Sequence, residues 1–496
     1  MNENVLGISI QKEKKADNII YAKANDFGFI KQTKFEKIRE DFKEWSLQTK
    51  FDCFSKIFHT RHVFIKLIWL SLFLIFTTLT AYFVAKNFLD YFAYETVSKI
   101  DIINEKPTEF PTVTICNVNP FTTQAAEKLI SNITISNFGK DIENFAIEQI
   151  LQNFSDVYEM AKMFASQKSY AETNKKLLSI PIGIIKCSFN NKPCSGANFT
   201  WYYYYVYGNC LQFNTGTNMT NIHVTTTEGP INGLSLILSI PQSQNFYPNL
   251  DGHGLKLFIH NKSFAPRIND LINIKAGFST NVAIEKTFSF KTPHPYSECE
   301  DLTSFTSVYQ STLKAANKTY RQYDCIKLCL QRLIIVSCDC YWTRYTNLDK
   351  TKPPCLNLTQ LYCINDQLND FEIDEECLEQ CPLECDTVTY GVQTSSLDYP
   401  SQTLYSYLLN DKEYVQSFEK SIGKNFSMEN INVYLVSLNI FFPFTQYTEI
   451  SQEPKTSVFE LVSQIGGSMG MLVGFSIFHL VELIEILIII LSTILN

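Results

Sequence analysis

The stretch from Met469 to Leu495, MGMLVGFSIFHLVELIEILIIILSTIL, decides which class of fold this sequence can adopt. It is long and apolar enough to cross the ~30 Å hydrocarbon core of a bilayer, which takes about 20 helical residues. A second stretch at 63–85, VFIKLIWLSLFLIFTTLTAYFVA, passes the same test with a single charge at Lys66. A buried helix of a soluble protein rarely runs this long, so the sequence predicts two membrane spans.

The two spans divide the chain into four segments. We expect a cytoplasmic N-terminus at 1–62, a transmembrane helix at 63–85, an extracellular domain at 86–456, and a pre-pore segment with the second helix at 457–495. Residues 1–62 hold 12 Lys/Arg against 9 Asp/Glu, and this excess favours a cytoplasmic N-terminus. A two-span chain then returns to the cytoplasm. The sequence thus predicts a plasma-membrane protein, embedded in the lipid bilayer, with both termini cytoplasmic.

The cysteines agree with this topology. Of 15 cysteines only Cys53 lies on the predicted cytoplasmic side, and the other 14 lie between Cys116 and Cys385. An even number in an extracellular region is typical of a disulfide framework. A structural metal site is disfavoured because the region has no Cys-x-x-Cys pair and few histidines. Candidate glycosylation sequons in the same region are Asn132, Asn153, Asn198, Asn218, Asn261, Asn317, Asn357 and Asn425.

Residue periodicity predicts a mixed α+β extracellular domain with a sheet core and helical subdomains. The segment TVTICNV and the stretches 231–240, 254–259 and 431–442 alternate like strands. Residues 125–180 have a helical pattern. Residues 299–390 hold ten cysteines and little periodicity, so we expect cross-links to stabilise this subdomain more than a core does.

Two glutamates in the second span are costly in lipid, at about 2–3 kcal/mol each. Glu482 and Glu485 are three residues apart, which places both on one helix face, and His479 lies near the same stripe. Rings of these carboxylates from several subunits would attract cations and exclude anions. The alternative is that the pair reaches the cytoplasmic interface, but about ten apolar residues follow Glu485. The stripe therefore favours a pore.

Small residues precede this stripe. Gly466, Gly467 and Gly470 are followed by Gly474-Phe475-Ser476. Such residues let helices approach closely, and irregular backbone at membrane depth is tolerated where it lines a water-filled path. Plain helix packing is the alternative, but together with the acidic stripe the glycines indicate a constriction.

These residues resemble the degenerin/epithelial sodium channel/acid-sensing ion channel family. Phe110–Asn117, FPTVTICN, is similar to its first extracellular strand, and 465–486 is similar to its pore helix. Gly474-Phe475-Ser476 stands in the place of the G-x-S selectivity filter, and Glu482 and Glu485 match the paired pore acids.

The resemblance implies a homotrimer or a heterotrimer of related subunits, with a palm-like sheet core and an amiloride-blockable, sodium-preferring current. It also implies seven disulfides, of which the Cys325 and Cys329 pairings rest on an unusual cysteine spacing. The pairs are Cys116–Cys210, Cys187–Cys194, Cys299–Cys385, Cys325–Cys381, Cys329–Cys377, Cys338–Cys363 and Cys340–Cys355.

Further positions concern gating. Tyr91 and Tyr296 fall where the family couples its extracellular domain to the pore through aromatic contact, with simple packing as the alternative. Asp52-Cys53 stands where the family has a His-Gly pair that tunes gating, and Phe475 fills a position that is usually small. These departures put normal gating and selectivity in question.

We therefore expect one subunit of an extracellularly ligand-gated, sodium-preferring channel. The segment CPLECDTVTYG near Cys381 is similar to the neuropeptide-gated branch, which suggests an extracellular peptide ligand. Opening by protons, through Asp366, Asp370 and Glu372, or mechanical or constitutive opening are alternatives. An ATP-gated trimer and a two-span receptor without a pore are rivals that fit less well. The sequence shows no catalytic motif, so we expect no enzyme, no cofactor beyond the permeant sodium ion, and no nucleic-acid partner.

Overall fold

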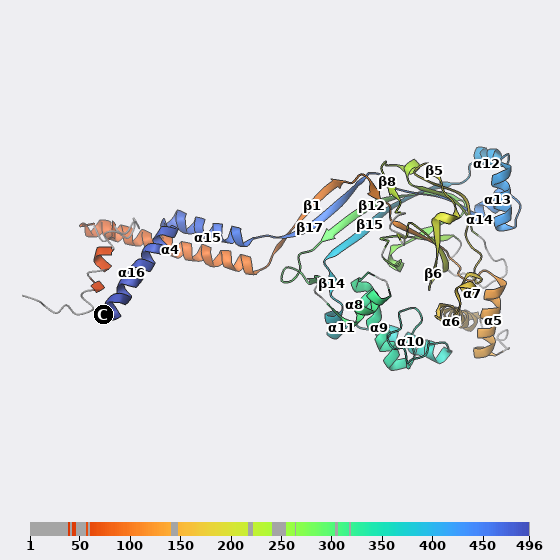
Figure 1. The fold of residues 1–496 in the computed structure, drawn as a ribbon, viewed down its shortest axis with the longest axis horizontal. Coiled ribbons are helices and arrows are strands. Elements are labelled where there is room, and N and C mark those ends of the chain that lie inside the picture. Colours follow the sequence, from red (N-terminus) through yellow and green to blue (C-terminus); the bar gives the residue numbers. More distant parts are fainter. Residues whose placement is uncertain are drawn as a thin grey trace, which may run out of the picture. The chain divides into compact units, whose positions relative to one another are not determined.

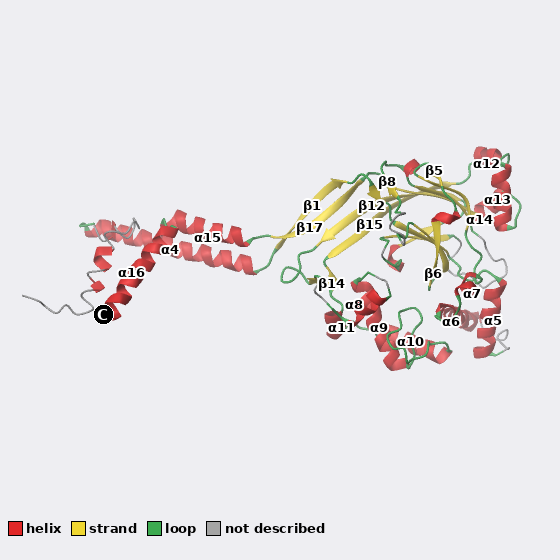
Figure 2. Ribbon diagram, in the orientation of Figure 1, coloured by secondary structure: helices red, strands yellow, loops and turns green. Residues whose placement is uncertain are grey.

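A computed structural model describes residues 38–39, 42–45, 56–57, 60–139, 147–216, 222–240, 254–262, 264–302, 306–316 and 319–495. The chain divides into two compact units. The helical unit comprises Met1–Glu95 and Pro454–Asn496, and the strand-rich unit comprises Thr96–Glu453. Figure 1 labels the elements of both units, and Figure 2 separates helices from strands by colour.

Two sheets form the centre of the strand-rich unit. The larger has eight strands in the order β1-β17-β12-β16-β9-β4-β5, with β15 also paired to β12. The smaller has five strands in the order β11-β10-β3-β7-β6. The strand bounds are β1 Thr96–Asn104, β2 Thr108–Glu109, β3 Thr112–Asn117, β4 Gly183–Phe189, β5 Lys192–Pro193, β6 Phe199–Tyr204, β7 Gly208–Phe213, β8 Val224–Thr225, β9 Leu234–Ser239, β10 Leu255–His260, β11 Leu271–Ile274, β12 Phe278–Phe290, β13 Cys299–Glu300, β14 Leu383–Glu384, β15 Asp386–Asp398, β16 Leu435–Phe441 and β17 Gln446–Pro454.

Strand β12 organises the larger sheet. It pairs antiparallel with β15 along all 13 of its residues. On its other edge it pairs in parallel first with β16 and then with β17. The alternating side chains of both sheets form one apolar core, in which Ile115 and Leu257 of the smaller sheet join Leu236 and Leu438 of the larger.

Ten helices of the strand-rich unit lie within the described residues and form three groups (Figure 1). Each group contributes to its own buried cluster or clusters: α5–α7 around Ile130 and Ala161, α8–α11 around Leu328 and Ile334, and α12–α14 around Phe418. The bounds are α5 Gln124–Phe138, α6 Ile147–Ser166, α7 Glu172–Lys176, α8 Val308–Ala315, α9 Gln322–Cys338, α10 Leu358–Asp370, α11 Glu375–Gln380, α12 Gln402–Leu408, α13 Lys412–Ile422 and α14 Met428–Tyr434.

The mixed α+β class predicted from the sequence is confirmed, but two local predictions need correction. The described residues of 299–390 contain four helices and contribute to two buried clusters, which their low periodicity did not reveal; those clusters include disulfide cysteines, so the weight of cross-links against packing stays a prediction. Residues 431–434 end a helix instead of starting a strand. The hydroxyl of Ser427 accepts from the Asn430 N–H at 3.3 Å, and Ile431 and Tyr434 are buried, so capping and packing outweigh the β-branched pattern.

Seven disulfides cross-link the strand-rich unit, and they join the same cysteine pairs that the family resemblance implies. The Cys325–Cys381 and Cys329–Cys377 bridges are neighbours, since Cys329 Sγ lies 3.9 Å from Cys381 Sγ. A change of one residue in spacing could therefore exchange the partners, which is why spacing alone leaves these two pairings open.

The helical unit contains three helices that bear on membrane crossing. Helix α4, Val63–Phe92, has 30 residues, so it is about 45 Å long and continues beyond the predicted end at residue 85. Helices α15, Val458–Val473, and α16, Ile477–Leu495, bend by 78° at the break between them. Helix α4 is long and apolar enough to span a bilayer, whereas α15 and α16 qualify only as one broken span. The second expected span is therefore present as a broken pair and is not confirmed as one helix, and its break falls among the small residues where the sequence indicated a constriction.

Candidate functional site

The break between α15 and α16 falls at Gly474-Phe475-Ser476, the segment predicted to form the filter. Gly474 ends α15 in the left-handed region, at φ 71° and ψ 20°. Its N–H donates to the Gly470 oxygen at 3.0 Å, and the Phe475 N–H donates to the Met469 oxygen at 3.2 Å. These two hydrogen bonds close the last turn of α15, which contains Gly470 of the glycine-rich segment. Glycine is favoured here because a side chain at positive φ is strained.

The start of α16 is held by its own side chains. Nδ1 of His479 accepts a hydrogen bond from the Ser476 N–H at 2.9 Å and lies 2.8 Å from the Ser476 hydroxyl. The His479 N–H donates to the Ser476 oxygen at 3.0 Å. The His479 side chain thus bonds back to Ser476, the residue just before α16, as the third helical residue of a capping box does. Because Nδ1 accepts from a backbone N–H, it carries no proton in this geometry.

The acidic pair lies on α16 beyond this cap. Ser476 and Glu482 are six residues apart, or about 9 Å along the axis, and Glu485 lies about 5 Å further. Glu482 is half-buried and Glu485 is exposed. Large apolar side chains surround them on the outside of the helix, and Phe478 is 74% exposed. A helix with this surface needs lipid or other subunits around it.

Helix α15 packs against α4 within the helical unit. A capping box fixes its start, in which Ser457 Oγ accepts from the Glu460 N–H at 3.1 Å and Glu460 Oε2 accepts from the Ser457 N–H at 2.7 Å. The Lys455 N–H donates to the Glu95 oxygen at 2.8 Å, and their side chains form an exposed ion pair. These contacts join the end of α4 to the start of α15. Gly466 and Gly467 are exposed within α15, so the space beside them is open to a neighbouring helix.

The remaining predicted positions are dispersed. Tyr91 lies on α4 in the helical unit and Tyr296 is half-buried in the strand-rich unit, so their coupling stays a prediction. Asp52 and Cys53 lie outside the described residues. The sequons at Asn132, Asn198, Asn357 and Asn425 are exposed and Asn261 is half-buried, while Asn218, Asn317 and the side chain of Asn153 lie outside the described residues.

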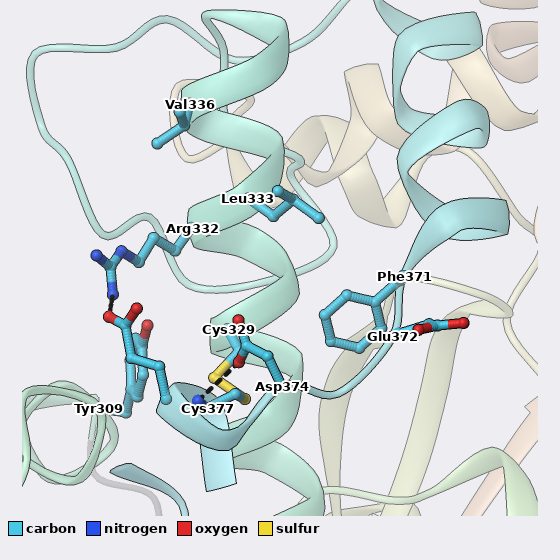
Figure 3. A pocket seen from close by; sticks show the side chains of 10 residues that line it. Tyr309, Cys329, Arg332, Leu333, Val336, Phe371, Glu372, Asp374 and Cys377 are labelled. Carbon is cyan, nitrogen blue, oxygen red and sulfur yellow. Dashed lines mark hydrogen bonds and ion pairs between the residues drawn. A yellow bond between two sulfur atoms is a disulfide. The ribbon is translucent and has the colours of Figure 1, made fainter. Parts of the chain in front are cut away.

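Figure 3 shows a pocket of about 230 Å³ beside α9 and α11. Arg332 on α9 pairs with Glu376 on α11 at 2.7 Å, and Asp374 Oδ1 accepts from the Cys377 N–H at 2.8 Å. Glu372, one of the acids considered for proton sensing, lies on its rim. Asp366 and Asp370 on α10 are exposed, as Glu372 is. All three acids are thus exposed to solvent, and their part in gating stays a prediction.

A second cavity, of about 320 Å³, was missed at the sequence level. It lies among Tyr202–Tyr205, the α9 side chains Tyr323 and Lys327, and Arg344. The run of aromatic residues WYYYY at 201–205 is the signal that could have drawn attention to it. Lys327 and Arg344 follow more than 100 residues later, so only the tertiary structure brings them to the tyrosines.

The site therefore consists of an apolar helix pair that is broken at small residues, with an acidic stripe beyond the break. A sequence profile described as "Amiloride-sensitive sodium channel" matches residues 46–486. The chain therefore belongs to the amiloride-sensitive sodium channel family, and the degenerin/epithelial sodium channel resemblance is confirmed. The family consists of ion channels, so the expectation that the chain is no enzyme is also confirmed.

Individual relatives are distant but extend over most of the chain. The bile acid-sensitive ion channel of Mus musculus is 26% identical over 466 residues, which cover 91% of this chain and 87% of the relative. Acid-sensing ion channel 2 of Homo sapiens is 27% identical over 422 residues, covering 80% and 75%. Epithelial sodium channel subunit beta of Xenopus laevis is 29% identical over 310 residues, covering 62% and 46%.

Proposed function

We propose that the chain is one subunit of a trimeric, two-span plasma-membrane channel that conducts sodium in preference to other cations and is blocked by amiloride. The break at Gly474–Ser476 carries this proposal. A membrane helix that unwinds in an apolar setting leaves backbone groups that lipid cannot satisfy, so such a break belongs beside water, ions or other subunits. Three copies around one axis would place three breaks around a common path.

The polarity of the break suits a cation. The C-terminal end of α15 carries a partial negative charge and leaves carbonyl oxygens of its last turn outside the helix ladder. Carbonyl oxygens and carboxylate rings are the groups that select cations in pores. Glu482 and Glu485 would then hold cations on the cytoplasmic side of the filter. The family assignment favours this channel over a two-span receptor without a pore.

An extracellular small molecule or peptide is the proposed trigger. The relatives named bile acid-sensitive and acid-sensing channels show that members of the family respond to different stimuli. The candidate acids Asp366, Asp370 and Glu372 are all exposed, which speaks against them as a buried proton sensor. Homotrimers and heterotrimers remain alternatives, since one relative is named as the beta subunit of a sodium channel.

The proposal is tested by expressing the full chain in oocytes under voltage clamp, with sodium substitution, amiloride, acid and a peptide panel. Glu482→Gln is expected to lower unit sodium conductance or sodium preference, because it removes a charge from each subunit's stripe. Glu413→Gln on α13, an exposed acid of the strand-rich unit, is the matched control. An unchanged reversal potential and unit conductance in Glu482→Gln would contradict the acidic ring.

A further inference from the structure

The 320 Å³ cavity of the strand-rich unit has the size of a small-molecule site. Ligand pockets typically enclose about 300–1,000 Å³, so this one suits a ligand no larger than a substituted amino acid. Its walls include Tyr202–Tyr205 at and after β6, Tyr323 and Lys327 on α9, and the segment 343–346. Further lining residues are Ser166, Lys175, Ala265, Pro266 and Leu313.

The aromatic wall is fixed and stays uncharged. The Trp342 Nε1–H donates to the Tyr205 hydroxyl at 3.0 Å, and that hydroxyl donates to Glu159 Oε1 at 2.8 Å. Burial raises the pKa of Tyr202 to about 12 and also raises the pKa of Tyr204. These phenols are therefore neutral at physiological pH, and they offer apolar faces together with hydroxyl donors.

Three cations line the same cavity. The Arg344 guanidinium lies 5.1 Å from the ring centre of Trp342 and 5.6 Å from that of Tyr205. The Lys327 amine lies 5.2 Å from the ring centre of Tyr323, and Lys175 is equally far from the ring of Tyr203. Aromatic faces stabilise a cation without neutralising it. Within the described part of the chain, Lys175, Lys327 and Arg344 form no side-chain ion pair.

The cavity consequently keeps an excess of positive charge. Its one lining acid, Asp324, already pairs with Arg321 at 2.6 Å. Burial lowers the pKa of Lys327, and the nearby charge of Arg344 lowers it further. Burial also lowers the pKa of Lys175. A bound anion would relieve the repulsion between Lys327 and Arg344, whereas a cationic ligand would add to it.

We propose that this cavity binds a small organic anion with a flat apolar body, such as a carboxylate that carries an aromatic ring. The carboxylate pairs with Arg344 and Lys327, and the ring packs against the tyrosine wall. Charge-assisted hydrogen bonds contribute about 1.5–3 kcal/mol, so the anion should bind at least about tenfold more tightly than a neutral ligand of the same shape. This inference does not depend on the proposed pore, because binding is measured without current.

The test uses the purified full chain in lipid nanodiscs and isothermal titration calorimetry. The probes are N-acetyl-L-phenylalanine as its carboxylate and the corresponding neutral carboxamide. In the unmodified chain the carboxylate should bind at least about tenfold more tightly. Lys327→Gln and Arg344→Gln should reduce this preference towards unity. Lys412→Gln on α13 removes the same charge at an exposed position away from the cavity and should leave the preference unchanged.

Arg344 also stacks on the rings around it, so its removal can loosen the wall. Among the described residues, Lys327 lies over the ring of Tyr323 alone. Thermal melting of each variant identifies any loss of folding. Equal binding of carboxylate and carboxamide would overturn the proposal, as would the absence of carboxylate binding at millimolar concentration. An unchanged preference in folded Lys327→Gln, or an equal loss in Lys412→Gln, would overturn it as well.

Discussion

Gly474→Ala perturbs the break between α15 and α16 with the smallest possible chemical change. Gly474 has φ 71°, and a Cβ added there would meet no heavy atom within 4 Å among the described residues. The cost of alanine is therefore conformational and not steric. Holding an L-residue in the left-handed region costs about 1–2 kcal/mol, which is about a 5- to 30-fold shift in the equilibrium away from the observed break.

In the Gly474→Ala variant the backbone relaxes by continuing α15 through position 474. This removes the geometry that presents Phe475 and Ser476. We expect Gly474→Ala to shift the sodium-to-potassium preference and to reduce unit conductance. The assay is the reversal potential under bi-ionic conditions, with single-channel recording from the same oocytes. Gly474→Asn should have a weaker effect, because asparagine visits the left-handed region more readily than alanine does.

Gly423 supplies a matched control. It ends α13 at φ 71° and ψ 22° with open space around it, so Gly423→Ala has the same conformational cost in the strand-rich unit. This change should not alter ion preference in the way that Gly474→Ala does. A Gly474→Ala channel with the reversal potential and conductance of the unmodified chain would refute the role of the break.

Three further predictions concern local contacts. His479→Ala removes both the imidazole and the acceptor for the Ser476 N–H, so the pH dependence of conductance should change. His479→Asn keeps an amide acceptor without a titratable ring and should change the pH profile in the same way. An identical pH profile in both variants would place the ring outside the conduction path. Burial lowers the pKa of His260 to about 4, so below pH 6.5 the unfolded chain binds a proton that the folded chain does not. About 3 kcal/mol of the free energy of unfolding should therefore be lost as the pH falls from 6.5 to 4. His260→Gln should flatten that part of the plot of denaturation midpoint against pH, and an unchanged slope would contradict this prediction. The buried Lys286 ammonium lies 3.1 Å from Glu105 Oε2, and Glu105→Gln removes this counter-charge. The free energy of unfolding, measured by guanidinium denaturation, should fall by about 2 kcal/mol. No change would show that water replaces the carboxylate.

Much of the fold follows from local sequence patterns. The strands at 112–117 and 234–239 lie inside their predicted ranges, and the strand at 255–260 ends one residue beyond the predicted range 254–259. Most of the 30 residues of α4 are apolar, with charges only at Lys66, Lys86 and Asp90, and a helix satisfies its own backbone hydrogen bonds in lipid. The helices of the region 299–390 were not predicted, because α9 carries buried side chains on several faces, including Cys325, Leu328 and Gln331. Burial on several faces obscures the amphipathic period of a helix.

The candidate site was located from the sequence but its form was not. Residue types and spacing at Gly474–Ser476 and at Glu482 and Glu485 are local properties, and they mark the segment without any knowledge of its neighbours. Whether the backbone bends at those glycines depends on the balance between helix propensity and the packing of α15 on α4. Helices α4 and α15 begin nearly 400 residues apart in the sequence. A short window around the glycines therefore does not contain the residues that set this balance.

The sequence by itself determined the two apolar segments, the cysteine-rich strand and helix region between them, and the acidic stripe, because hydrophobicity and periodicity act over a few turns of chain. Only the tertiary structure decided the 78° bend at Gly474–Ser476, the return of His479 to Ser476, and the meeting of Tyr205 with Arg344. The last of these joins residues that are 139 positions apart. Such contacts depend on how two sheets and their covering helices pack, and packing is a property of the whole folded chain.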